Sequence, residues 1–420
     1  MFDYRGHFSL RLDELRATGG YRNFLDIERV AGSFPAAIRH RGAGEPQPVT
    51  VWCSNDYLGM GQHPEVLAAM RATLDATGAG SGGSRNISGT SHLHGRLEAE
   101  LADLHGKESA LLFPSGYSAN DAALTVLGRL LPGAVILSDA LNHASLIAGI
   151  RHSGADKRVF RHNDAAHLDS LLAEIPRDRP KVVVLESVYS MDGDIAPLRE
   201  LAAVARRHGA LTFLDEVHAV GIYGPRGAGI AARDGVAGGF DVVMGTLAKA
   251  FGVAGGYIAG DAEIVDAVRS FASAFIFTTS PAPVVVAGAL AAVVHLKRST
   301  VERDVLFRHS ALLHRLLRQA RIPVVSDATH LVPVLVGDAR QCARIAADLL
   351  EEYGLYVQPI NAPSVPAGTE RLRVTPTPAH TPERIEEFAT ALDKLWTRHG
   401  LPRLEAPRVA DRSDALLLTH

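Results

Sequence analysis

Short, continuously apolar runs rich in β-branched residues alternate with amphipathic stretches of helical spacing through the middle of the chain. Strands that are apolar on both faces are typical of a parallel sheet, because crossover helices cover both faces of such a sheet. The alternation therefore predicts an α/β fold built on a large, mostly parallel sheet. We expect seven strands, at VTVWCS (49–54), ALLFPS (110–115), AVILSD (134–139), KVVVLES (181–187), LTFLDEV (211–217), VVMGTL (242–247) and GGYIAG (255–260).

The pattern changes after about residue 295, where charged helical stretches surround shorter apolar segments. Helices expected at 302–320, 339–353 and 381–399 flank the segments HLVPVLVG, LYVQPI and RLRVTP, which predicts a smaller C-terminal α+β domain. We divide the chain into an N-terminal arm (1–48), a large domain (49–295), a small domain (296–400) and a tail (401–420).

Composition excludes several classes of function. The 420 residues are 47% hydrophobic and carry a formal net charge of -3, so the chain can bury a large core and has no basic field for nucleic acid. Cys53 and Cys342 have neither metal nor redox spacing and suit a reducing cytoplasm. The N-terminus shows no targeting signal, and the longest apolar run, PAPVVVAGALAAVV, is too short to span a bilayer. We expect a cytoplasmic protein that binds neither membrane nor nucleic acid.

An acid and a lysine follow two of the predicted strands. Asp215 and His218 in LTFLDEVHAVGIYG belong at the carboxyl edge of the sheet, where open α/β sheets bind ligands. Lys249 in GTLAKAFG lies among small and apolar residues, which lower the pKa of an amine and favour a Schiff base. An aspartate that faces the pyridine nitrogen of pyridoxal phosphate (PLP) makes that ring an electron sink. Alone, the aspartate reads as a turn cap and the lysine as a solvated side chain. Together with the features below, they indicate a PLP site.

A candidate phosphate site follows the strand at 110–115. Ser115, Gly116 and Tyr117 open a helix in FPSGYSANDAALTVL, and backbone N–H groups at a helix start bind phosphate. The turn is common, however, and the chain has no GxxxxGK[ST] motif of a P-loop nucleotidase. The Gly-rich stretch GAGSGGSRNISGT (78–90) suits either a flexible loop or a substrate-lining one.

Two further side chains have both an ordinary and a functional interpretation. His143 follows the strand at 134–139, so it either caps a helix or lies flat against a cofactor ring. Arg373 in RLRVTP either forms a surface ion pair or binds a substrate carboxylate with its planar guanidinium. The remaining histidines form no HExxH or Cys/His pattern, so we expect no metal site.

From about residue 21 to 400 the chain resembles the α-oxoamine synthases, a branch of the fold-type I PLP enzymes. The resemblance is carried by SNDYLG (54–59), GSGGSR (80–85), DALNHAS (139–145), LDEVHAVGIYGPRGAG (214–229) and GTLAKAFG (245–252). Longer motifs are most similar to those of the 5-aminolevulinate synthases: YRNFLDIER (21–29), VWCSNDYLGMGQHP (51–64), SRNISGT (84–90), FRHND (160–164), ESVYSMDGD (186–194), FIFTTS (275–280) and QPINAPSVPAGTERLRVTPTP (358–378).

This resemblance implies a fold-type I transferase that uses PLP to condense glycine with succinyl-CoA, releasing CoA and CO2, in a homodimer with shared active sites. It also implies roles for individual residues. Catalysis would fall to Lys249, which carries the cofactor, to Asp215 at the pyridine nitrogen and to His143, stacked on the ring. Other cofactor contacts would come from Ser115, Gly116, Tyr117, Ser190, His218 and Thr246, joined by Thr278 of the partner subunit and Thr279 of the partner subunit.

Substrate contacts also follow from the resemblance. Arg373 and Asn55 would hold the carboxylate of glycine, and the succinyl end would meet Arg22, Ser84, Asn86 and Ile87. A buried succinyl carboxylate needs a charged partner such as Arg22. The sequence departs from close relatives at Ser84, where they usually have threonine, and at Ala248, where many have glycine.

Three other interpretations remain open at this stage. A sister synthase, such as 8-amino-7-oxononanoate synthase or glycine C-acetyltransferase, would use another acyl-CoA or amino acid. A PLP aminotransferase or decarboxylase would share only the fold. A catalytically silent subunit is disfavoured because Lys249, Asp215 and His143 are all present.

Overall fold

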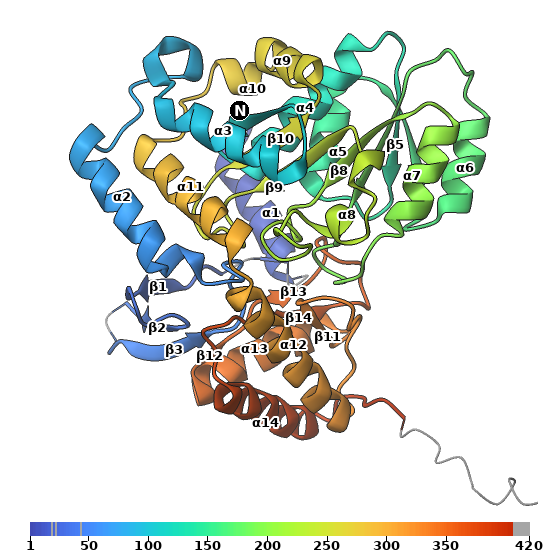
Figure 1. Cartoon of the computed structure of the whole chain (residues 1–420). Helices are drawn as coiled ribbons and strands as arrows, with labels where there is room; N and C mark the ends of the chain where they lie inside the picture. The colour runs from blue at the N-terminus through green and yellow to red at the C-terminus, as the bar shows by residue number, and fades with distance from the viewer. Residues whose placement is uncertain (18–19, 22, 43, 406–420) are drawn as a thin grey trace, which may run out of the picture.

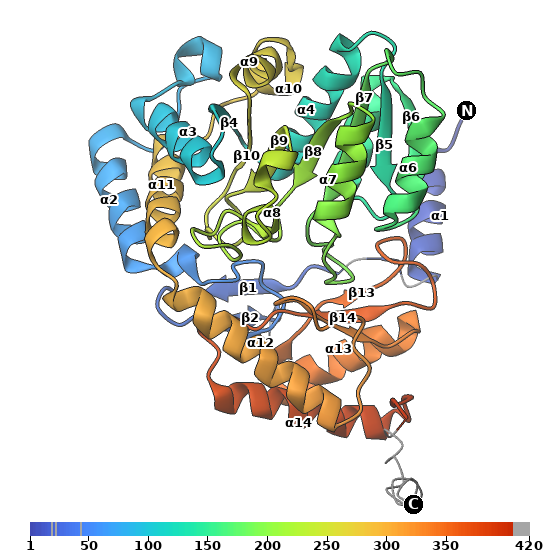
Figure 2. The ribbon, with the colours of Figure 1, turned by 45° about the vertical axis from the view of Figure 1, so that its right-hand side comes forward.

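The computed structural model describes residues 1–17, 20–21, 23–42 and 44–405. Two bodies are visible in Figures 1 and 2: an upper one in which helices surround a large twisted sheet, and a lower one built from smaller sheets and α12–α14. The long helix α12 (Val301–Gln319) follows α11 (Pro283–Arg298) and leads the chain from the upper body into the lower one.

The large sheet has seven strands in the order β4-β10-β9-β8-β7-β5-β6. Strand β10 runs antiparallel to both of its neighbours, and the other pairings in this sheet are parallel. The predicted α/β class with a mostly parallel seven-stranded sheet is thus confirmed. The strands are β4 (Ser109–Phe113), β5 (Val135–Asp139), β6 (Asp156–Phe160), β7 (Lys181–Glu186), β8 (Leu211–Asp215), β9 (Val242–Thr246) and β10 (Gly256–Gly260).

The prediction was wrong about one member of this sheet. VTVWCS (49–54) contributes β3 (Gln47–Val51) to a separate four-stranded sheet, β1-β2-β3-β12, where β3 pairs in parallel with β12 (Leu355–Tyr356). The seventh strand of the large sheet is instead β6, DKRVF, at its edge. Most side chains of β6 reach solvent, so it lacks the continuous apolar run on which the prediction relied.

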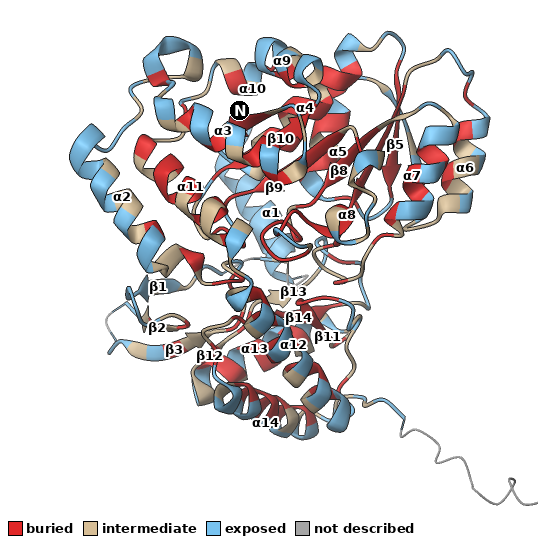
Figure 3. Ribbon diagram, viewed as in Figure 1, coloured by how far each residue is buried: buried red, intermediate tan, exposed pale blue. Residues whose placement is uncertain are grey.

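Helices cover both faces of the large sheet, and apart from the edge strand β6 its strands are almost entirely buried (Figure 3). Gly209 adopts a positive φ of 62° directly after α7, as expected at a helix C-terminus. The helices of this body are α2 (Pro64–Thr77), α3 (His92–His105), α4 (Gly116–Leu130), α5 (Ala144–Ser153), α6 (Ala165–Ala173), α7 (Leu198–Arg207), α8 (Ile230–Arg233), α9 (Ala262–Phe271), α10 (Ser273–Ile276) and α11.

The lower body has its own apolar core. Trp52 lies within it, with its ring 4.0 Å from that of His380 and 4.4 Å from that of Phe388. Trp52 therefore ties the chain that follows β3 to the C-terminal part of the molecule. The remaining elements are β1 (Asp26–Arg29), β2 (Ala36–His40), β11 (Val332–Leu335), α13 (Ala339–Tyr353), β13 (Pro359–Ile360), β14 (Arg371–Val374) and α14 (Pro382–Arg398). The predicted boundaries at 48/49, 295/296 and 400/401 stay predictions.

Helix α1 (Tyr4–Ala17) differs from the other long helices because none of its residues is buried. It exposes Phe8, Leu10, Leu12 and Leu15 on the surface of the single chain. Among the described residues, no single helix has the length and apolar composition of a membrane span, and α11 with α12 meets that test only as a pair bent by 77°.

Candidate active site

A cavity of about 320 Å³ opens at the carboxyl ends of β7, β8 and β9, beside the first turn of α4. This is the edge of the sheet at which the sequence predicted a ligand site. Its walls bring together ten predicted residues: Asn55, Gly116, Tyr117, His143, Ser190, Asp215, His218, Thr246, Lys249 and Arg373. Six further residues that the sequence did not single out complete the lining: Asn120, Ser145, Glu186, Met191, Val217 and Met244.

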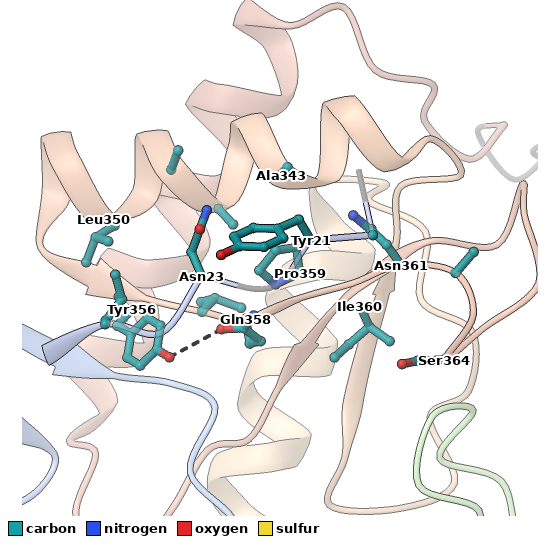
Figure 4. A pocket seen from close by; sticks show the side chains of 16 residues that line it. Tyr21, Asn23, Ala343, Leu350, Tyr356, Gln358, Pro359, Ile360, Asn361 and Ser364 are labelled. Atoms are coloured by element: carbon teal, nitrogen blue, oxygen red, sulfur yellow. Dashed lines mark hydrogen bonds between the residues drawn. The ribbon is translucent and has the colours of Figure 1, made fainter. Parts of the chain in front are cut away.

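A larger hollow of about 490 Å³ lies on the lower body, between α13 and the arm segment that carries Tyr21 and Asn23 (Figure 4). Its lining is mostly apolar and includes none of the predicted site residues. The chemistry-bearing side chains converge on the smaller cavity, which is therefore the candidate active site.

Lys249 follows β9 and lies at the base of the cavity, with its Nζ 2.8 Å from Nε2 of His218. Burial lowers the pKa of Lys249 to about 7, although the nearby Asp215 carboxylate opposes the shift. Burial also holds the pKa of His218 well below its usual value, so the imidazole is neutral. Its other nitrogen lies 2.8 Å from the hydroxyl of Tyr57. A substantial fraction of Lys249 is thus an uncharged, nucleophilic amine near neutral pH.

Asp215 ends β8 and is buried. Burial raises its pKa, whereas hydrogen bonds from Asn120 Nδ2 (2.8 Å) and the backbone N–H of Val217 (2.8 Å) favour its ionised form. A protonated pyridine nitrogen would supply the positive charge that this carboxylate needs. Asn120, which the sequence interpretation missed, also donates to Ser145 Oγ, so it fixes the carboxylate relative to α5.

His143 is the N-cap of α5, and its ring lines the cavity. Its Nδ1 lies 2.7 Å from Ser145 Oγ, which fixes the ring orientation, and burial lowers its pKa. Its backbone N–H donates to Glu186 Oε1 at 2.6 Å. His143 is therefore a helix cap whose ring also lines the cavity, and its stacking against a cofactor ring stays a prediction. Glu186 was not predicted, although it ends β7 as Asp215 ends β8, so an acid at a strand end could have pointed to it.

A cradle for an anion forms where α4 begins. Ser115 caps the helix by accepting the backbone N–H of Ser118 at 3.1 Å, and Gly116 and Tyr117 open toward the cavity. A Cβ on Gly116 would come within 3.0 Å of Met244 and 3.5 Å of Thr246 Oγ1, so only glycine keeps this space free. Ser115 itself lies outside the cavity lining. The helix start and Thr246 together suit a phosphate.

Arg373 reaches the cavity from β14 of the lower body. Its guanidinium donates to the backbone oxygen of Ser190 (2.8 Å), to Asn55 Oδ1 (3.0 Å) and to Tyr57 OH (2.8 Å). Within the described part of the chain, none of the ion pairs involves Arg373. A buried guanidinium held by neutral oxygens suits a substrate carboxylate as its counter-charge.

The predicted acyl-binding residues Ser84, Asn86 and Ile87 lie outside the Lys249 cavity. Ser84 forms an isolated antiparallel bridge with Thr279, and Ser280 donates its backbone N–H to Gly83 at 3.0 Å. We call Ser84, Asn86, Ile87, Phe277, Thr278 and Thr279 the edge patch. None of them lines the Lys249 cavity, and the side chains of Ile87 and Phe277 are 65% and 83% exposed. Arg22 falls outside the described residues.

The low-pKa amine, the buried carboxylate, the histidine on the cavity wall and the anion cradle suit the aldehyde, pyridine nitrogen, ring face and phosphate of PLP. Residues 47–392 match the model of aminotransferase class I and II. The chain is 55% identical to 5-aminolevulinate synthase 2 of Cereibacter sphaeroides, with 93% of this chain and 96% of the relative aligned. It is also 55% identical to 5-aminolevulinate synthase of Rhizobium meliloti, over 96% and 100% of the two chains.

Among solved structures, the chain resembles serine palmitoyltransferase from S. paucimobilis, which holds a bound PLP-myriocin aldimine. The TM-score is 0.88 and the identity 33%, covering 95% of this chain and 100% of that one. Geometry and similarity agree on a PLP-dependent acyltransferase, and the chain belongs to the 5-aminolevulinate synthase family, within aminotransferase class I and II.

Proposed function

We propose that the Lys249 cavity, completed by the edge patch of a second subunit, is where this chain condenses glycine with succinyl-CoA to give 5-aminolevulinate, CoA and CO2. The similar proteins reported above are named 5-aminolevulinate synthases after this reaction. One observation supports this assignment of residues above all. The amine of Lys249, whose pKa is lowered, and the guanidinium of Arg373 line the same cavity.

When PLP is bound, its ring supplies an electron sink for the charge that remains when the α-proton of glycine leaves. Asp215 would strengthen that sink by placing a negative charge at the pyridine nitrogen. His143 would cover the ring face, and Gly116 and Thr246 would hold the phosphate. Because these groups are fixed by hydrogen bonds before substrate arrives, little reorganisation is needed during the reaction.

Lys249 is suited to move the proton at the α-carbon of glycine. Its amine is buried and has a pKa of about 7, so both protonation states are accessible near neutral pH. His218 and Tyr57 orient the amine through a continuous chain of polar contacts that ends at Arg373. Arg373 and Asn55 orient the carboxylate of glycine, so the arginine that positions the substrate is linked to the lysine that acts on it.

We place the acyl end of the reaction between two copies of the chain. The edge patch lies outside the cavity of its own chain and exposes Ile87 and Phe277, and α1 buries no side chain against its own chain. A homodimer would cover these surfaces and bring Thr278 of the partner subunit and Thr279 of the partner subunit to the phosphate. Arg22, Ser84, Asn86 and Ile87 would then recognise the succinyl group, and the arginine charge would disfavour uncharged acyl chains.

The sister synthases receive less support than aminolevulinate formation. Relatives named 5-aminolevulinate synthase are 53–55% identical over nearly the whole chain, whereas 8-amino-7-oxononanoate synthase from Francisella tularensis is 23% identical and shares the fold. We propose a cytoplasmic location because Cys53 and Cys342 are both free thiols.

Product identification tests this proposal. Purified protein loaded with PLP is incubated with glycine or serine and with succinyl-, acetyl-, pimeloyl- or palmitoyl-CoA, and products are identified by mass spectrometry. We expect 5-aminolevulinate from glycine and succinyl-CoA as the dominant product. The variant Arg22→Leu should lower succinyl-CoA turnover selectively, with turnover of acetyl-CoA as its internal control. A dominant product from another pair of substrates would overturn the assignment.

A further inference from the structure

The motif RHND (161–164) has no role in the chemistry described above, yet it connects two walls of the cavity. His162 follows β6 and is held between two carboxylates. Its Nδ1 lies 2.8 Å from Asp139 Oδ1, and its Nε2 lies 2.8 Å from Asp194 Oδ2. Burial opposes a charge on His162, but the two carboxylates outweigh it and raise the pKa to about 10. His162 is therefore an imidazolium at neutral pH.

The first carboxylate belongs to the turn that carries His143. Asp139 ends β5, its side chain is fully buried, and Oδ1 also accepts the backbone N–H of Leu141 at 2.8 Å. Its Oδ2 accepts the backbone N–H of Asn163, a residue held at a positive φ of 55°. Asp139 thus sets the path of residues 139–143, which we call the His143 turn, and through it the placement of the histidine that faces the cofactor.

The second carboxylate belongs to the loop that carries Ser190. Residues 188–195, which we call the Ser190 loop, are closed by a bridge between Val188 and Ile195 and place Ser190 and Met191 in the cavity. Asp194 Oδ2 receives both His162 and Asn163 Nδ2, the latter at 2.7 Å.

The Ser190 loop is also held from the lower body. Arg373 donates to the backbone oxygen of Ser190 at 2.8 Å, and Arg371 pairs with Asp192 at 2.8 Å. The ring of Tyr189 meets that of His162 edge-on, with centroids 4.4 Å apart. The Ser190 loop, which His162 contacts through Asp194, therefore also orients Arg373, the arginine that we assign to the substrate.

From this geometry we infer that His162 is a positioning residue, a charged clip that holds the His143 turn and the Ser190 loop in fixed relation across the cavity. The inference rests on the proposed function only in assigning the cofactor to His143 and glycine to Arg373. A neutral side chain at this position would leave two carboxylates facing each other without a cation, so the two walls would separate.

The test compares His162→Gln with His208→Gln. His208 is a matched control, because it pairs with Asp169 at 2.7 Å and is about as exposed as His162, at 23% against 25%. Its partner Asp169 lies in α6, outside both the His143 turn and the Ser190 loop. We measure the melting temperature, the dissociation constant of PLP by fluorescence, and kcat and the KM for glycine. We expect His162→Gln to weaken PLP binding and to raise the KM for glycine by about 10- to 100-fold relative to His208→Gln.

A charge-retaining variant separates clipping from folding. His162→Arg keeps a cation with several donors and should recover part of the PLP affinity, whereas a purely structural role would leave it no better than glutamine. If His162→Gln fails to fold, Asp194→Asn removes one arm of the clip and should raise the KM for glycine. Equal PLP affinity and equal KM in His162→Gln and His208→Gln would overturn the inference. Failure of the wild type to make 5-aminolevulinate would instead overturn the proposed function, while the PLP affinities would still test the clip.

Discussion

In the Lys249 cavity, Asp215, His218 and Arg373 are buried, and a chain of polar contacts within one chain joins Lys249 to Arg373. Most side chains of the edge patch are exposed, and Ser84 meets Thr279 through a backbone bridge. The cavity already holds its charges and donors in place. The patch presents hydroxyl, amide and apolar groups that do not line the Lys249 cavity of their own chain. The contrast fits our proposal that the fold of one chain prepares the cofactor site, while acyl-CoA recognition uses the edge patch of a second subunit.

The largest expected effect comes from removing the amine of Lys249, which tests whether the cavity carries the cofactor chemistry. Lys249→Ala should lower kcat by more than about 1000-fold, because no other described side chain in the cavity can bind the aldehyde and move the same proton. Steady-state formation of 5-aminolevulinate measures the loss. Lys394→Ala, on the exposed face of α14, is the control and should match the wild type. Near-normal turnover in Lys249→Ala would remove the cavity from the mechanism.

Mixing two inactive variants tests whether the patch serves a second subunit. The double variant Asn86→Ala/Thr279→Ala should lose about 100-fold in activity, because it loses contacts that position the acyl donor and the phosphate. Co-expression with Lys249→Ala should restore roughly a quarter of wild-type activity, since half of the dimers formed at random contain one intact site. Purification through two different tags isolates the mixed dimers, which should retain about half of the wild-type activity per dimer because one of their two sites is intact. No recovery would mean that cavity and patch do not combine across subunits.

The pH dependence of PLP capture sharpens the account of the cavity. Only the neutral amine reacts, so the rate at which apoprotein captures PLP should rise with pH through about 7 and level off above it. Asp215 raises the pKa of Lys249, so Asp215→Asn should shift the midpoint to lower pH. Borohydride-reducible absorbance measures the rate. Thr279→Ala, in the patch, should leave the midpoint in place; a common shift in both variants would contradict the separation of the two regions.

The smallest expected effect concerns the fine shape of the patch. Ser84 accepts the backbone N–H of Ile87 at 3.3 Å, a bond that threonine would keep while adding a methyl group. Ser84→Thr should raise the preference for succinyl-CoA over glutaryl-CoA by about threefold, measured as the ratio of kcat/KM values. Ser81→Thr, nearby in the same Gly-rich stretch, serves as the control. An unchanged ratio would mean that Ser84 does not contact the acyl chain.

Much of the cavity could be predicted because its key residues follow strands. Asp215 ends β8 and Lys249 follows β9, so parallel topology alone brings them to one edge. Asn120 and Tyr57 escaped prediction because their importance comes from contacts between distant segments: Asn120 donates to a carboxylate 95 positions away. No local periodicity records such a contact. Tyr57 is part of the motif SNDYLG, but only the fold shows that its hydroxyl contacts both His218 and Arg373.

Strand membership failed for a related reason. β3 pairs with the nearby β2 on one side and with β12, more than 300 residues away, on the other, so its sheet cannot be chosen from the apolar run at 49–54 alone. β6 carries three charged residues and still belongs to the large sheet. It is the edge strand, with a partner strand on one side only, so its charged side chains can reach solvent. A continuous apolar run predicts that a strand is buried, but it does not predict which sheet the strand joins.

The place of β4 in the large sheet has a consequence for the order of events on the ribosome. β4 is the first strand of this sheet to be synthesised, but its sole neighbour in the described sheet is β10, which ends at Gly260. At about 5–20 residues per second, roughly 7–30 s pass before that partner exists. During this interval the nascent chain carries β4 without its partner strand, so we expect the yield of folded enzyme to depend on protection of this apolar segment until β10 is made.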